Sequence, residues 1–200
     1  MLHQTFARKV VPVYRKFLES YPTVSALAGA DPQRVERLMM PLGLQRRGRR
    51  IVALAQVLVR EHGGQVPGDE DGLLALPGVG PYTAGAVLAF AYERRAAIPD
   101  TNVIRLLRRF FGLGPPDARP PSSISAAMRR AALDLVPRRK PRDYNYALLD
   151  FASLVCTHYR PRCTSCPVRA RCVAWATYYS SRESPGDGPG RFLGLGSTRA

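Results

Sequence analysis

The chain has 200 residues, 46% of them hydrophobic, and a formal net charge of +15 at neutral pH. This length allows one compact body or two small lobes, and it excludes several independent domains. The apolar runs, such as residues 84–91, are far shorter than the roughly 20 residues that span a bilayer, and no secretory signal opens the chain. We therefore expect a cytoplasmic protein with reduced cysteines, no membrane contact and a polyanionic partner such as nucleic acid.

The first third of the chain has the apolar spacing of amphipathic helices. This spacing predicts three helices, over residues 6–18, 31–39 and 45–61. Gly43, Gly63 and Gly64 follow the second and third of these helices, and we expect them to act as C-terminal caps.

The middle of the chain alternates short helices with turns. Asp69 or Asp71 is expected to cap a short helix. A Pro-Gly-Val-Gly-Pro turn comes next, and residues 82–92 then form a strongly apolar helix. A further helix is expected to begin after Asp100 and to end at Gly112.

The last third contains a loop, two helices and a tail. Residues 114–123 are Pro-rich and predict a loop, while helices are expected over residues 124–135 and 144–155. From about residue 180 the chain lacks periodicity and is rich in Gly, Ser, Pro and Arg, which predicts a disordered tail. Because no segment has the alternation of a strand, the predicted fold class is all-α.

The four cysteines of the chain are clustered in one short segment. They are Cys156, Cys163, Cys166 and Cys172. Four thiolates that close on one centre can hold a 4Fe-4S cluster or a structural zinc ion, and the long spacer after Cys156 leaves room to surround a cluster. Reduced cysteines without any metal are the remaining alternative.

A glycine-rich turn lies directly before one of the predicted helices. Residues 76–85 read Leu-Pro-Gly-Val-Gly-Pro-Tyr-Thr-Ala-Gly. The small side chains let the backbone of Gly78, Val79 and Gly80 approach a ligand, and the helix N-terminus adds partial positive charge. The turn can therefore bind a phosphate, although an ordinary connection between two helices has a similar composition.

Three segments together resemble one family. The turn at residues 76–85, the segment Ile-Pro-Asp-Thr-Asn-Val-Ile-Arg at residues 98–105 and the 6-2-5 cysteine spacing resemble the helix-hairpin-helix DNA glycosylases that carry an iron–sulfur cluster loop. Endonuclease III and the adenine and thymine mismatch glycosylases belong to this group. The resemblance implies base-excision repair, a structural 4Fe-4S cluster, and a monomer that binds double-stranded DNA with a mismatched or damaged base.

The resemblance also implies a two-lobed, endonuclease III-like fold. Residues 1–121 would form a helical barrel with the hairpin, residues 122–178 a cluster lobe, and residues 179–200 a disordered tail. Asp100 would then lie at the mouth of the cleft between the lobes.

The resemblance makes Asp100 the catalytic carboxylate. Breaking an N-glycosidic bond develops positive charge on the deoxyribose, which a fixed carboxylate stabilises. Asn102 matches a family residue that helps to place the sugar or the attacking water. From position alone, Asp100 is an N-cap and Asn102 a surface amide, and for Asp100 the two roles are compatible.

Further residues are expected to contact DNA. The cluster loop at residues 157–162 is basic, and the resemblance places Arg160 and Arg162 on the DNA backbone. It also implies a base flipped out of the duplex, with Gln4 filling the hole, although by position Gln4 is a frayed terminal residue. The family carries a glutamate just upstream of the equivalent of Met1. We therefore expect either a start assigned too late or a shortened, inactive relative.

Tyr82 separates the members of the family. It occupies the position of the Schiff-base lysine of endonuclease III, and no lysine lies between Lys16 and Lys140. A monofunctional glycosylase is therefore expected. Tyrosine here resembles the enzymes that act on T or U opposite G, with an adenine glycosylase as the runner-up and a non-catalytic DNA-binding iron–sulfur protein as the alternative from another class. The simpler account of Tyr82 is a helix residue with its hydroxyl in water.

Overall fold

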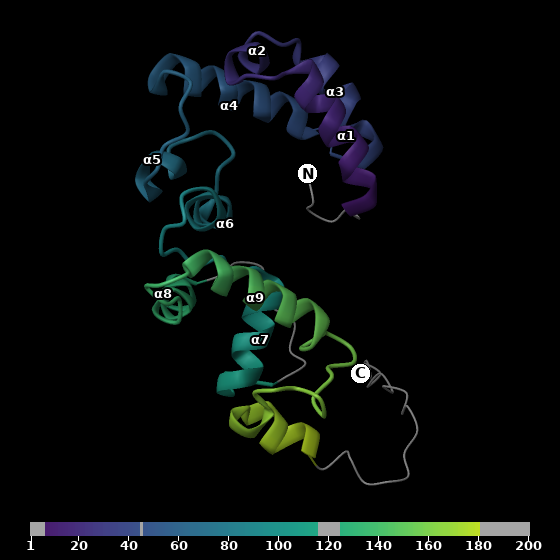
Figure 1. Cartoon of the computed structure of the whole chain (residues 1–200), viewed down its shortest axis with the longest axis vertical. Helices are drawn as coiled ribbons and strands as arrows, with labels where there is room; N and C mark the ends of the chain where they lie inside the picture. The colour runs from purple at the N-terminus through teal and green to yellow at the C-terminus, as the bar shows by residue number, and fades with distance from the viewer. Residues whose placement is uncertain (1–6, 45, 116–124, 181–200) are drawn as a thin grey trace, which may run out of the picture. The chain divides into compact units, whose positions relative to one another are not determined.

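A computed structural model describes residues 7–44, 46–115 and 125–180 (Figure 1). Every regular element in these ranges is helical, so the predicted all-α class is confirmed. Gln4, most of the predicted Pro-rich loop and residues 181–200 lie outside the described residues. None of the described helices combines the length and apolarity that a membrane crossing requires.

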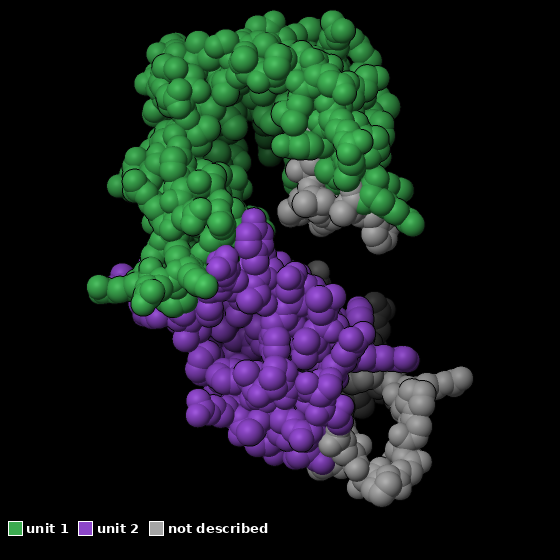
Figure 2. Space-filling view, in the orientation of Figure 1, with its two compact units in different colours: residues 1–98, 136–142 green, residues 99–135, 143–200 purple. Residues whose placement is uncertain are grey.

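The chain divides into two compact units, which Figure 2 shows in different colours. Unit 1 comprises Met1–Ile98 and Val136–Arg142, and unit 2 comprises Pro99–Leu135 and Asp143–Ala200. The chain therefore passes from one unit to the other three times.

Unit 1 begins with four helices around a small apolar core. They are α1 (Ala7–Ser20), α2 (Val24–Ala28), α3 (Pro32–Met39) and α4 (Arg46–His62). Both α2 and α3 pack against α4, and the core includes Phe17, Val35, Met39 and Val52. The three predicted helices correspond to α1, α3 and α4. The short α2 was not predicted, because five residues are too few to show a helical period.

Asp and Ser side chains act as N-caps for four of the described helices. Asp31 caps α3, Asp69 caps α5 (Glu70–Leu74), Asp100 caps α7 (Thr101–Phe111) and Ser125 caps α8 (Ala126–Asp134). Of the two candidates for α5, Asp69 is the cap: its Oδ1 accepts the N–H of Gly72 at 2.8 Å. Each cap satisfies an N–H group that the first helical turn leaves without a partner.

The predicted helix at residues 82–92 is α6 (Pro81–Ala86), which continues as a π-helical turn over Val87–Ala91. Gly85 in α6 is buried, and the carbonyl oxygen of Ala97 lies so close that any Cβ at this position would overlap it. The segment that leads to Ile98 therefore lies directly on α6.

Contacts of Arg95 and Arg142 help to hold residues 136–142 to the rest of unit 1. Arg95 Nε donates to the carbonyl oxygen of Val136 at 2.7 Å, and Arg142 Nη1 lies 2.5 Å from Glu93 Oε1. Arg142 is the second residue of α9 (Pro141–Leu154), which starts three residues earlier than predicted. Proline at the first helical position explains the earlier start, since a missing N–H costs nothing there.

Unit 2 is built around α7, whose apolar residues Val103, Ile104, Leu106 and Leu107 are buried. The predicted limits of α7 are confirmed, because Asp100 caps its start and Gly112 ends it with a left-handed φ of 69°. A Cβ on Gly112 would lie only 2.5 Å from Val173 Cγ1. After α9 come the cysteine-rich segment and a π-helical turn, Trp175–Tyr179.

Candidate active site and metal centre

Asp100 is a half-buried carboxylate held by two hydrogen bonds. Its Oδ1 accepts the backbone N–H of Val103 at 2.7 Å, and its Oδ2 accepts the side-chain amide of Asn102 at 3.1 Å. The first bond is the N-cap that the sequence allowed as an alternative role. Each carboxylate oxygen keeps a further lone pair, so capping leaves the group able to face a ligand.

A chain of hydrogen bonds runs from Asp100 to the first cysteine. Asn102 donates to Asp100, and its Oδ1 accepts from Arg105 Nη1 at 2.8 Å. Arg105 Nη2 donates to the carbonyl oxygens of Ala152 at 2.7 Å and Cys156 at 2.9 Å. Arg105 is only 6% exposed, and burial, followed by the charge of a neighbouring arginine, lowers the pKa of its guanidinium below the usual value. The carboxylate is therefore tied through two side chains to the end of α9.

A second buried arginine holds the start of the cysteine-rich segment. Arg109 is 2% exposed, and it donates through Nη1 to the carbonyl of Thr157 at 2.6 Å and through Nη2 to that of His158 at 2.9 Å. The same guanidinium lies 3.7 Å from Cys156 Sγ and over the ring of Tyr179. Sequence reasoning missed Arg105 and Arg109. Two arginines four residues apart within the apolar stretch of α7 are the signal that could have identified them.

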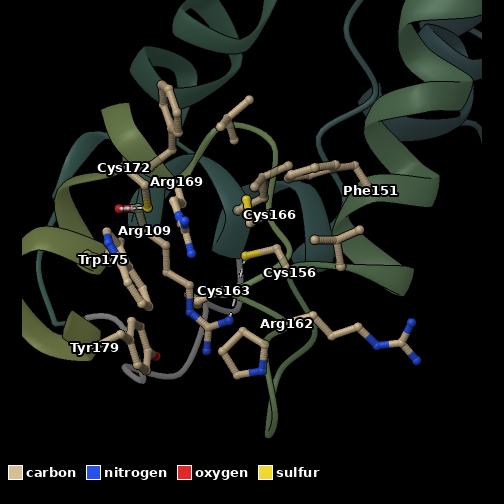
Figure 3. Close-up of a pocket in the computed structure, with 16 residues that line it drawn as sticks. Arg109, Phe151, Cys156, Arg162, Cys163, Cys166, Arg169, Cys172, Trp175 and Tyr179 are labelled. Carbon is tan, nitrogen blue, oxygen red and sulfur yellow. Dashed lines mark hydrogen bonds between the residues drawn. The ribbon is translucent and has the colours of Figure 1, made fainter. Parts of the chain in front are cut away.

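The four cysteines line one pocket (Figure 3). The pocket has a volume of about 30 Å³ and is also lined by Arg109, Arg169, Trp175 and Tyr179. Cys163 and Cys166 are joined by a tight turn, in which the N–H of Cys166 donates to the carbonyl of Cys163 at 3.1 Å. Within the described ranges, no three Cys, His, Asp or Glu side chains are placed to hold a single metal ion.

The thiol chemistry of this pocket fits a metal centre. Burial, and after it the charges of the neighbouring thiols, raise the pKa of Cys163 to about 11, while Arg109 opposes them. Thiolates crowded in this way repel one another, and bound iron ions would relieve that repulsion. The residue set therefore suits a polynuclear cluster with several thiolate ligands.

The glycine-rich turn has the backbone geometry of an anion-binding loop. Gly78 has a left-handed φ of 79°, and the N–H of Val79 donates to the carbonyl of Leu76 at 3.2 Å. Among the described residues, no backbone carbonyl accepts the N–H of Gly78 or Gly80. Tyr82 is the second residue of α6 and is 42% exposed.

The loop that follows Cys156 presents an exposed basic surface. The Thr157 hydroxyl donates to the carbonyl of Arg160 at 2.6 Å, which closes the loop into a turn. Arg160 and Arg162 are both exposed, and Figure 3 shows the Arg162 side chain pointing away from the cysteines. Tyr159 at the tip is 81% exposed.

Comparisons with known proteins give one consistent group. Residues 1–129 match a family model described as the HhH-GPD superfamily base excision DNA repair protein. A thymine/uracil-DNA glycosylase of Pyrobaculum aerophilum is 36% identical over 187 residues, which cover 92% of this chain and 79% of the relative. An adenine DNA glycosylase of Rattus norvegicus is 39% identical over 176 residues, which cover 87% of this chain but only 34% of the relative.

Solved structures give the same grouping. A thermostable thymine-DNA glycosylase superposes with a TM-score of 0.79 at 31% identity, covering 88% of this chain and 80% of the other. A trapped endonuclease III–DNA covalent intermediate superposes with a TM-score of 0.74 at 26% identity and the same coverage.

Proposed function

Because the chain belongs to the HhH-GPD superfamily of base excision DNA repair proteins, we propose that it is a DNA glycosylase that hydrolyses the N-glycosidic bond of a flipped T or U opposite G. The family predicted from the turn, the Asp100 segment and the cysteine spacing is confirmed. The observation that carries the proposal is the geometry of Asp100, a carboxylate fixed by two hydrogen bonds at the start of α7.

The chemistry follows from the charge that develops during bond breakage. As the base leaves, positive charge builds on the deoxyribose, and the fixed carboxylate of Asp100 stabilises it without having to reorient. Asn102 and Arg105 hold the carboxylate in position. Thymine or uracil leaves as an anion that hydrogen bonds can stabilise, whereas adenine leaves well only when protonated.

The product is an abasic site rather than a broken strand. Tyr82 stands where endonuclease III has its Schiff-base lysine, and the sequence has no lysine between Lys16 and Lys140. A phenol does not form a Schiff base with the sugar, so this position supplies no nucleophile for strand cleavage. The thymine/uracil relative supports pyrimidine release, and release of adenine is the competing outcome.

Cys156, Cys163, Cys166 and Cys172 would hold a 4Fe-4S cluster. When bound, the cluster would act as a structural crosslink between the end of α9 and the last described turn. Equal amounts of iron and acid-labile sulfide, with visible absorbance, would support this assignment. Bound zinc without visible absorbance would instead support a structural zinc ion, the alternative that the sequence allowed.

The proposed DNA contacts are the hairpin backbone at Gly78, Val79 and Gly80, and the exposed side chains of Arg160 and Arg162. Gln4, outside the described residues, is proposed to fill the hole left by the flipped base. The bound species would be a monomer on double-stranded DNA.

The experiment uses the protein in excess over duplexes with a single G:T, G:U or A:8-oxoguanine pair. Strand breaks are scored before and after alkali treatment. We expect breaks in the T or U strand only after alkali. Breaks before alkali contradict the monofunctional assignment, and breaks at adenine support an adenine glycosylase instead.

Asp100→Asn tests the catalytic residue. Asparagine caps a helix about as well as aspartate, so the variant should fold and bind DNA while excision falls by about 10²-fold or more. Asp69→Asn is the matched control, because Asp69 caps α5 in the same way. Full excision by Asp100→Asn refutes its catalytic role. Duplex binding with no excision by the unsubstituted protein points to the non-catalytic alternative.

A further inference from the structure

The first two turns of α4 contain four arginines, and one differs from the other three. Arg49 Nε lies 2.7 Å from Glu36 Oε1 on α3, so its charge is paired. Arg46, Arg47 and Arg50 are exposed, and no carboxylate of the described residues pairs with them. We call these three residues the arginine face.

The three side chains lie on one side of the helix. Arg46 and Arg47 precede Arg50 by four and three residues, and residues at these separations are neighbours on a helix surface. The first turn of α4 contains no acidic residue. Three like charges therefore lie together at the end of the helix that already carries partial positive charge, an arrangement that costs free energy in the free protein. A bound polyanion would relieve both effects.

The arginine face adjoins the hairpin. The Cδ of Arg50 lies 3.9 Å from the position that a Cβ on Gly78 would occupy, so the Arg50 side chain runs beside the turn. The backbone of α4 is fixed at this point, because a Cβ on Gly48 would lie 2.7 Å from the backbone nitrogen of Glu36. The turn therefore lies beside the Arg50 end of the arginine face, and both belong to unit 1.

From these observations we propose that the arginine face is a second phosphate-binding surface, which continues the hairpin along the backbone of the same DNA duplex. The proposal rests on the proposed function, because it assumes that the hairpin binds DNA. Several separate positive charges beside a loop suited to one phosphate match a polymer of phosphates better than a single small anion. Guanidinium groups favour such contacts because they can bind phosphate in a bidentate manner.

The test measures the affinity of the full-length, cluster-loaded protein for an undamaged duplex at several salt concentrations. The slope of log K against log salt is negative, and each phosphate contact contributes about 0.9 to its magnitude. The triple variant R46Q/R47Q/R50Q should therefore reduce the magnitude of the slope by about 2 to 3. The charge-matched control is R34Q/R37Q/R60Q. In the unsubstituted protein, Arg37 lies near Asp31 and Arg60 lies near Glu61. Because these charges are already partly paired, we expect the slope of the control to stay within about 1 of that of the unsubstituted protein.

A hairpin variant separates this proposal from the proposed function. Gly80 has a φ of −102° and no atom within 4 Å of an added Cβ, so Gly80→Val should fold and yet hinder the approach of a phosphate. Weaker binding by Gly80→Val with an unchanged slope for the arginine-face variant overturns the further inference alone. Unchanged binding by Gly80→Val overturns hairpin binding itself. An equal loss of slope in the charge-matched control also overturns the inference, because net charge would then explain the effect.

Discussion

Replacing Arg105 with glutamine should destabilise the protein strongly. The guanidinium makes four hydrogen bonds, at 2.7 to 3.2 Å, to three oxygens: Asn102 Oδ1 and the carbonyls of Ala152 and Cys156. The shorter glutamine amide can replace only part of this set, and each buried acceptor left unsatisfied costs about 1–3 kcal/mol. We therefore expect the free energy of unfolding to fall by about 3–5 kcal/mol.

The same change should slow excision in the molecules that remain folded. Without Arg105, Asn102 loses the bond that orients its amide toward Asp100. Denaturant unfolding monitored by circular dichroism gives the free energy of unfolding, and single-turnover excision at saturating protein gives the excision rate. Arg130→Gln is the control, since Arg130 is exposed and lies 3.8 Å from Asp134, a pair worth less than about 1 kcal/mol. A stability loss below about 1 kcal/mol with unchanged excision would refute the reasoning.

Three further predictions concern packing, pH and the metal centre. Gly85→Ala forces a methyl group into the carbonyl of Ala97 and should cost about 1–3 kcal/mol or more in denaturant unfolding, whereas Gly29→Ala, with its nearest neighbour at 3.8 Å, should be nearly neutral. Burial raises the pKa of Tyr144 above 10, so unfolding releases a proton at high pH. Stability should therefore fall as the pH rises above 10, and Tyr144→Phe should reduce that fall, as pH-dependent melting would detect. Removing the metal centre with an oxidant and chelator should raise the emission of Trp175, the only tryptophan, which lines the cysteine pocket; unchanged emission would count against a bound cluster there.

Local sequence signals predicted much of the fold. The limits of α7 were correct because Asp100 and Gly112 are a helix cap and a left-handed glycine, whose effects act within a few residues. The family was also identified correctly, since the glycine turn and the cysteine spacing are short, continuous motifs.

Features that depend on distant contacts were not predictable. Arg105 and Arg109 are buried because carbonyl groups about fifty positions later in the chain accept their hydrogen bonds. From composition alone, such arginines are predicted to lie on the surface, since charged side chains are rarely buried without partners. Likewise, Gly85 carries no local mark of its contact with Ala97.

The threefold passage of the chain between the units has a consequence for biosynthesis. Unit 1 needs residues 136–142, which follow much of unit 2 in the sequence. Residues 1–98 therefore leave the ribosome without their last segment, and the Glu93–Arg142 and Arg95–Val136 contacts can form only after some forty further residues have been made. Domains usually fold one after another as they emerge. Here unit 1 is complete only once residue 142 has been made, so a nascent chain stopped before residue 136 should lack both of these contacts.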